Sequence, residues 1–169
     1  KDELEADDLV VVRTDHPDAG PLSRSGLRPS SDLAIHLVAY AARPDIRAVA
    51  HAHLPASMAL TLAGEVPDPA ALPETALFLP RLPYLAFMAM GSQELADRIA
   101  AALAEPPEPL AGAVLLERHG AVSVGSDLAS AIDRLELVEV LCRTWRDSLL
   151  IRAALAALGV DAIGANFWP

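Results

Sequence analysis

Three histidines offer the clearest chemistry in this sequence. His51 and His53 are separated by one residue within segment 46–54, whose alternating pattern predicts a β-strand. Strand geometry places two such imidazoles on one face, about 6.5 Å apart at the backbone, from which both can reach one ion at Zn–N distances of about 2.0–2.1 Å. His119 lies between two apolar segments, and Gly120 after it permits a turn that aims the ring inward. The three rings are therefore candidate ligands of a divalent metal.

Each of these histidines also has a simpler interpretation. An HxH pair on a strand occurs at surfaces, where the rings are hydrated or hydrogen-bonded. A buried His119 could equally donate to a backbone carbonyl. These alternatives remain open from the residues alone.

A helix start at residues 29–32 offers a carboxylate and two hydroxyls. The pattern predicts a helix running to about Ala42, with a serine capping its first turn and Asp32 where the helix dipole favours a negative charge. Ser30 and Ser31, with the free N–H groups there, form a candidate phosphate cradle. The alternative is an ordinary capped helix with an exposed Asp32.

Three imidazoles and one carboxylate favour zinc over magnesium or calcium, with another transition metal such as Mn²⁺ as the alternative. The ion would polarise a carbonyl or stabilise an enediolate as a Lewis acid. A nearby carboxylate could move the proton. A phosphate cradle beside such a site predicts a small phosphorylated substrate.

The elements that must position these groups alternate between strands and helices, which predicts an α/β layered fold. The first helix should bury a stripe of Leu33, His36, Leu37 and Tyr40. The long last helix, from residues 126–127 to near Gly159, exceeds the usual length, so a bend or break within it is an alternative. The other expected elements are strands at 9–13, 113–116 and 121–124, a loop at 15–29, helices at 56–63 and 92–103, a proline-rich connection at 64–83 and a surface loop at 105–109.

Composition narrows the class of protein. The chain has 169 residues, 53% of them apolar, which is enough for one domain with a sizeable core. A net charge of −10 argues against nucleic acid and anionic membranes as partners. The longest apolar stretch, about 82–90, is far shorter than the roughly 20 residues of a spanning helix. With no visible signal peptide and Cys142 as the single cysteine, we expect a cytoplasmic protein without an internal disulfide.

Longer runs around the candidate residues resemble a known family. The runs PSSDLAIHLVAYAARPDIRAVAHAHLP, PRLPYLAFMAMGSQELADRIAAAL and LLERHGAVSVGSDLASAIDRLELVE resemble, in this order, segments of the class II aldolase/adducin family. The resemblance implies one domain over residues 1–169, with the family's N-terminal portion lying before Lys1. It also implies a central, mainly antiparallel sheet flanked by helices, and a homotetramer with active sites between subunits.

The same resemblance implies roles for individual residues. His51, His53 and His119 match the metal ligands, and Ser30 and Ser31 match the phosphate-binding serines. Asp32 falls where the aldolases have a glutamate that acts as ligand and base. The expected function is that of a metal-dependent aldolase, which cleaves or forms a short ketose phosphate through a zinc-stabilised enediolate.

Two departures keep other functions open. Asp32 is one methylene shorter than the aldolase glutamate and is similar to the sugar-phosphate 4-epimerase branch, so epimerisation or decarboxylation is the alternative. The region 67–79 has no tyrosine where the aldolases place a catalytic acid, which leaves Glu74 and Asp68 as weak candidates. A non-enzymatic, adducin-like assembly module is the third interpretation, and the intact histidine set argues against it.

Overall fold

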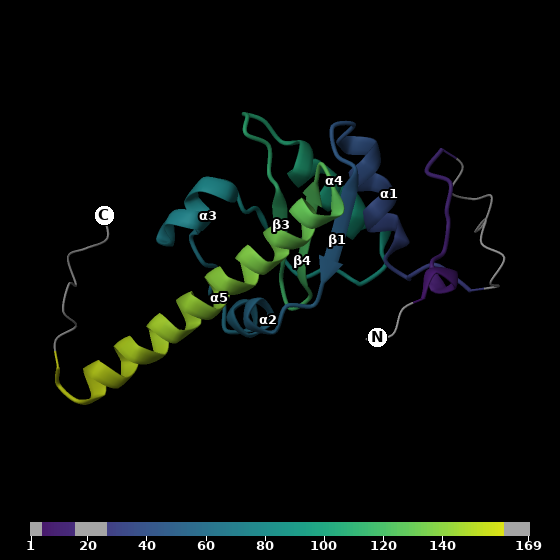
Figure 1. Cartoon of the computed structure of the whole chain (residues 1–169). Coiled ribbons are helices and arrows are strands. Elements are labelled where there is room, and N and C mark those ends of the chain that lie inside the picture. Colours follow the sequence, from purple (N-terminus) through teal and green to yellow (C-terminus); the bar gives the residue numbers. More distant parts are fainter. Residues whose placement is uncertain (1–4, 16–26, 161–169) are drawn as a thin grey trace.

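A four-stranded sheet forms the middle of the fold (Figure 1), which is described here from a computed structural model covering residues 5–15 and 27–160. The sheet has the strand order β1-β4-β3-β2, and β4 runs antiparallel to both of its neighbours. Only β2 is parallel to its neighbour, β3, so the prediction of a mainly antiparallel sheet is confirmed and one parallel pairing makes it mixed. The strands are β1 (Ala48–Ala52), β2 (Tyr84–Leu85), β3 (Ala113–Leu116) and β4 (Gly120–Gly125).

Helices cover both faces of this sheet and create two apolar cores. On one face, α1 (Leu33–Ala42) and α4 (Gln93–Ala104) pack on valine and leucine side chains of the strands. On the other face, α2 (Pro55–Leu62) and α5 (Leu128–Ala157) pack on alternate residues of the same strands. Because side chains of a strand point alternately to its two faces, strands buried on both sides are mostly apolar, and His51 in β1 and Ser123 in β4 are the polar exceptions among these strands. The remaining elements are η1 (Ala6–Asp8), η3 (Pro69–Ala71) and α3 (Pro73–Phe78).

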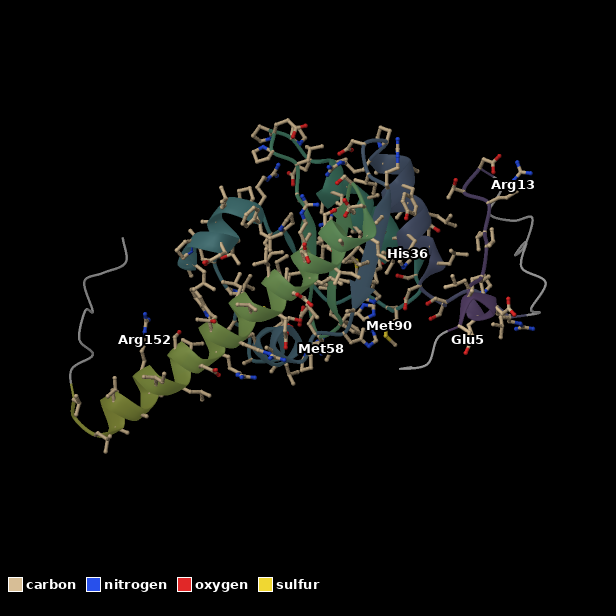
Figure 2. All side chains as sticks on the ribbon, viewed as in Figure 1. Glu5, Arg13, His36, Met58, Met90 and Arg152 are labelled. Carbon is tan, nitrogen blue, oxygen red and sulfur yellow. The ribbon has the colours of Figure 1, made fainter. Side chains whose placement is uncertain are left out.

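The long last helix, α5, is continuous over 30 residues and contains no break. It begins as predicted, because Asp127 and Ser130 form a reciprocal capping box at its start. Its C-terminal half, which carries Arg152, extends past α2 and α3 and beyond the rest of the fold (Figures 1 and 2). No helix in the described parts of the chain is long and apolar enough to cross a membrane.

Three local predictions were wrong. Residues 9–13 are not a strand, because none of the paired strands runs beside them. The fully buried positions of α1 are Ile35 and Ala39, and the predicted stripe is only half-buried, because α1 packs on α4 as well as on the sheet. The predicted serine cap is also displaced: Ser30 Oγ accepts from the N–H of Asp32, the residue before the helix.

Candidate metal centre

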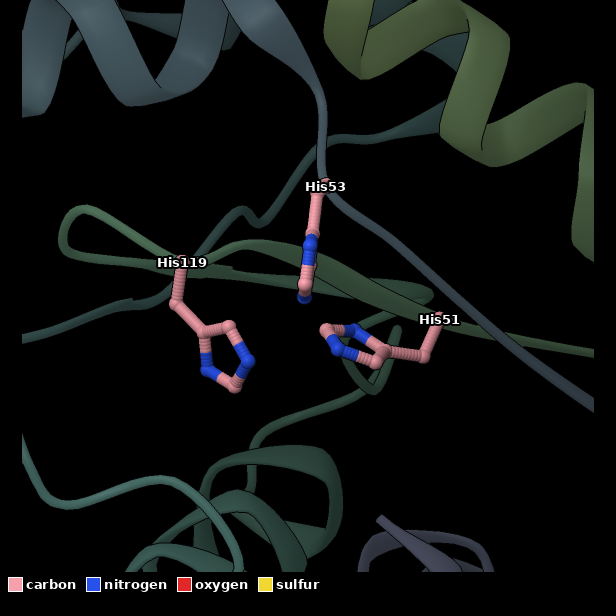
Figure 3. A group of neighbouring side chains, drawn as sticks. All are labelled: His51, His53 and His119. Carbon is pink, nitrogen blue, oxygen red and sulfur yellow. The ribbon is translucent and has the colours of Figure 1, made fainter. Parts of the chain in front are cut away.

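The imidazoles of His51, His53 and His119 converge at one end of the sheet (Figure 3). One ring nitrogen from each lies within 4.8 Å of the other two, and the ring centroids are 4.9–5.3 Å apart. His51 lies in β1, His53 follows this strand, and His119 precedes β4. Small rotations of the rings bring three nitrogens at this spacing to the roughly 3.4 Å separation of ligands on a tetrahedral zinc ion. The sequence prediction that these residues lie together is confirmed.

A backbone contact fixes which nitrogen of His51 is available. Nδ1 of His51 lies 3.0 Å from the carbonyl oxygen of Ala121 on β4. A carbonyl only accepts, so Nδ1 carries the proton and donates it, and Nε2 keeps its lone pair. Histidine ligands of metals are typically oriented by such a contact from the second nitrogen.

Three polar atoms around this point are buried and have no hydrogen-bond partner among the described residues. They are Nε2 of His51, Nε2 of His119 and Oδ1 of Asp32. A buried polar atom without a partner costs about 1–3 kcal/mol, so three in one place would destabilise the fold considerably. A cation held by the lone pairs of His51 and His119 would satisfy both ring nitrogens. Asp32 is not in the group of converging donors, although it lies within electrostatic reach of the rings. The donor set therefore fits a divalent metal such as zinc.

Burial also keeps the rings neutral, which is the form that binds metal. Burial lowers the pKa of His51, and it lowers the pKa of His119, where the neighbouring rings of His51 and His53 act in the same direction. The carboxylate of Asp32 opposes this lowering of the pKa in both rings without cancelling it, so Asp32 lies within electrostatic reach of them. A fourth ring, His36 on α1 (Figure 2), has its pKa lowered by burial and hydrogen-bonds the backbone of Val49; it is not one of the converging rings.

The other predicted site residues divide into two groups. Ser30 and Ser31 are exposed just before α1, next to Asp32, and the loop at Gly91 packs close to the carbonyl of Ser31. Glu74 and Asp68 are exposed near α3, and the structure brings neither into the group of three imidazoles. The carboxylate of Asp68 instead accepts from the N–H of Ala70. The predicted loop residues 16–26 lie outside the described residues.

The turn that presents His119 has an unusual backbone. Arg118 has a φ of 56°, a left-handed conformation that is rare for residues with a side chain and costs of order 1–3 kcal/mol. Gly120 has a φ of 114°, and a Cβ there would lie 2.1 Å from the carbonyl oxygen of Ala52 and 2.9 Å from Cα of His53. Only glycine lets the two histidine-bearing segments approach this closely.

Two side chains that sequence analysis missed hold these segments. The hydroxyl of Thr61 accepts from the N–H of Arg118, and the carboxylate of Glu139 accepts from the N–H of Ala56. Both contacts join residues more than 50 positions apart in the chain, so no local sequence pattern could have revealed them.

Comparison with known proteins places this centre in a family. The family model for the class II aldolase and adducin N-terminal domain matches residues 1–146. The chain belongs to this family. The model covers both histidine-bearing segments and the helix start at Asp32.

Curated relatives of this family member include fuculose phosphate aldolases. The enzyme from Escherichia coli O6:H1 is 31% identical over 142 residues, which are 82% of this chain and 62% of that protein. The one from Methanococcus maripaludis (strain C5) is 28% identical over 118 residues, which are 69% of this chain and 60% of that protein. The chain thus spans less than two thirds of the length of these two relatives.

Solved structures agree with this assignment. YgbL from Escherichia coli, a candidate aldolase/epimerase/decarboxylase, is 27% identical with a TM-score of 0.68, over 84% of this chain and 66% of that one. L-fuculose-1-phosphate aldolase from Thermus thermophilus is 25% identical with a TM-score of 0.70, over 90% of this chain and 74% of that one. The shared fold therefore includes most of this chain.

Gly120→Ala tests the close approach of the two histidine segments. We expect a loss of about 2–4 kcal/mol in the free energy of unfolding of the metal-free protein, together with weaker zinc binding, because the new Cβ separates Ala52 and His53 from β4. Urea unfolding with chelator present and a zinc titration would measure the two effects.

Gly64→Ala is the matched control for this change. Gly64 also has a positive φ, of 80°, but a Cβ there meets nothing within 4 Å. It should cost only about 1 kcal/mol and leave zinc affinity unchanged. Equal zinc affinity in both variants would contradict the role of Gly120.

Proposed function

We propose that this protein is a metal-dependent aldolase that cleaves or forms a short ketose phosphate. The observation that carries the proposal is the convergence of His51, His53 and His119, two of which have a buried ring nitrogen without a hydrogen-bond partner among the described residues. Membership of the class II aldolase and adducin family supports it, as do relatives named fuculose phosphate aldolase. Zinc is the proposed metal, because the donors are mainly imidazole nitrogens.

The three imidazoles would hold the ion, and Asp32 would complete the set or handle a proton. A bound zinc ion supplies Lewis-acid polarisation of a substrate carbonyl. Oδ1 of Asp32 is buried and has no partner in the described part of the chain, so this carboxylate is a strong acceptor for a ligand or for a substrate hydroxyl proton. Burial of His51 and His119 keeps both lone pairs free near neutral pH, since their pKa values are lowered.

Ser30 and Ser31 are proposed to hold the substrate phosphate. Both are exposed and directly precede the ten-residue helix α1, next to Asp32. The N-terminus of a helix favours an anion through its free N–H groups and its dipole. A phosphate there would lie next to Asp32 in the sequence, on the same helix start.

A second function uses the same centre: epimerisation or decarboxylation of a sugar phosphate. The observation that favours it is Asp32, which is one methylene shorter than the aldolase glutamate. YgbL, which is named for all three reaction types, is also similar to this chain. All three reactions begin by placing negative charge next to a polarised carbonyl, so the histidines alone do not distinguish them.

We also propose that the protein works as a homotetramer in the cytoplasm. Near its C-terminal end, α5 exposes the apolar side chains of Leu150 and Ile151, and Leu158 directly after the helix is exposed as well, with 62%, 59% and 75% of their surface accessible. A helix end that extends beyond the body of the fold gains little stability by itself, so we propose that a second copy of the chain packs against these exposed side chains.

Removal of the metal tests the aldolase proposal. Dialysis against a chelator should abolish aldol cleavage of ketose phosphates, and added zinc should restore it. His51→Ala should lower the rate by more than about 100-fold and reduce bound zinc, because it removes a donor. Zinc content by elemental analysis and a coupled aldehyde assay would give both readouts.

His36→Ala is the matched control, because this half-buried ring is outside the converging group. It should retain stoichiometric zinc. Activity that survives both chelation and His51→Ala would rule out the metal-dependent mechanism. A protein that neither binds zinc nor turns over any sugar phosphate would favour the adducin-like assembly module.

Product analysis separates aldolase from epimerase. On ribulose 5-phosphate, NMR should show no inversion at C4 if the aldolase proposal is correct, and fuculose 1-phosphate should release an aldehyde. Inversion at C4 without released aldehyde would assign the epimerase reaction. Asp32→Asn should lower the rate of either reaction, because the amide neither accepts a proton nor supplies a negative ligand.

Disruption of the projecting apolar surface tests the tetramer. Changing both Leu150 and Ile151 to Glu should dissociate the assembly to smaller species, as measured by light scattering after size exclusion, because buried charges without partners oppose association. The exposed Leu62 on α2 provides a Leu62→Glu control. A wild-type protein that is monomeric at micromolar concentration would refute the proposal.

A further inference from the structure

The two histidine-bearing segments that flank the metal centre are attached to opposite ends of the same helix, α2. His53 lies two residues before Pro55, the first residue of α2. Arg118, which precedes His119, donates its N–H to Thr61 in the last turn of α2 at 3.0 Å. The positions of His53 and His119 are therefore both tied to this short helix.

At the C-terminal end of α2, a buried hydroxyl makes the connection to the His119 segment. Thr61 is 3% exposed, and its Oγ1 donates to the carbonyl of Ser57 at 2.9 Å while accepting from Arg118. Its proton is thus directed away from Arg118, which leaves a lone pair for the Arg118 N–H. This contact holds the residue with the left-handed backbone conformation, directly before His119.

At the N-terminal end of α2, a carboxylate from α5 holds the backbone in place. The residue at the start of α2, Leu54, offers no side-chain cap. Instead both carboxylate oxygens of Glu139 accept from the N–H of Ala56, at 3.2 and 3.1 Å. The Glu139 side chain is 12% exposed and is itself held by Arg143 at 3.0 Å. A carboxylate at this place satisfies a free N–H and complements the helix dipole.

We infer that Thr61 and Glu139 are positioning residues of the metal centre, which set the separation of His53 and His119 through α2. Neither side chain is among the metal-donor groups. Thr61 holds the backbone of the residue before His119, and Glu139 holds the backbone of Ala56, three residues after His53. The inference rests on the proposed metal site. Loss of either contact should loosen one donor relative to the other two, so that zinc binding weakens more than the fold does.

Conservative pairs of variants distinguish this role from a purely structural one. Thr61→Val keeps the shape of the side chain but removes the acceptor, whereas Thr61→Ser keeps the hydroxyl. Glu139→Ala removes the cap, whereas Glu139→Gln retains an acceptor oxygen. Ser123→Ala is the control, because Ser123 is also buried but its hydroxyl donates to the carbonyl of Ala131 at the start of α5 and not to a residue of either histidine-bearing segment.

Three measurements on the full chain give the readouts: zinc affinity by competition with a chromogenic chelator, the visible absorption of the Co²⁺-loaded protein, and urea unfolding without metal. Thr61→Val and Glu139→Ala should each weaken zinc binding by about tenfold or more, the lower end for residues that orient metal ligands. Their Co²⁺ spectra should change in intensity, because the coordination geometry changes. Thr61→Ser and Glu139→Gln should bind zinc within about threefold of wild type.

The outcomes separate this inference from the proposed function. A wild-type protein that binds zinc, with Thr61→Val and Glu139→Ala unchanged in affinity and Co²⁺ spectrum, would overturn the inference alone. The inference would also be overturned if Ser123→Ala weakened zinc binding as much as Thr61→Val and Glu139→Ala. A wild-type protein without zinc affinity would overturn the proposed metal site as well. If Thr61→Val does not fold, the Glu139 pair provides the comparison.

Discussion

The antiparallel pairing of β1 with β4 is the constraint on which the candidate metal centre depends. Its register ends at Ala52 opposite Ala121, so the next residues outward on the two strands are His53 and Gly120. The contact from His51 to the carbonyl of Ala121 joins positions 70 residues apart. A shift of this register by one residue would turn His51 to the opposite face of the sheet and separate it from His119.

Burial at the end of this pairing has two opposed consequences. It removes water from His51 and His119 and leaves their Nε2 atoms without partners among the described residues, which costs stability. It also lowers the pKa of both rings, so they remain unprotonated and able to bind a cation near neutral pH. A metal ion bound to these neutral rings would supply the missing partners of the two Nε2 atoms and so recover the lost stability. Structural histidines in an apolar core would instead have partners for both nitrogens.

Much of this arrangement could be predicted from local patterns, because the decisive residues lie in regular elements. The alternation in segment 46–54 placed His51 and His53 together, and the glycine after His119 indicated the turn. The strand at 9–13 was wrongly predicted because pairing depends on a neighbouring strand, which the local pattern does not contain. The buried positions of α1 were missed because α4, which lies about 60 residues further along the chain, packs against α1 and buries Ile35 and Ala39. Thr61 and Glu139 were missed for the same reason, since their partners are remote in sequence.

The histidines and the carboxylate come from different layers of the fold, and this separation bears on which reaction is catalysed. The three imidazoles are fixed by the sheet, whereas Asp32 is carried by α1, whose place is set by Ile35 and Ala39 packed in the core shared with α4. A shorter side chain than glutamate reaches about 1.5 Å less far, so Asp32 can serve as ligand only if α1 lies close to the sheet. Its Oδ1 is buried and has no hydrogen-bond partner among the described residues. Whether Asp32 would reach a metal held by the three imidazoles therefore depends on the packing of α1 against α4 and the sheet, because Asp32 is not among the converging donor groups.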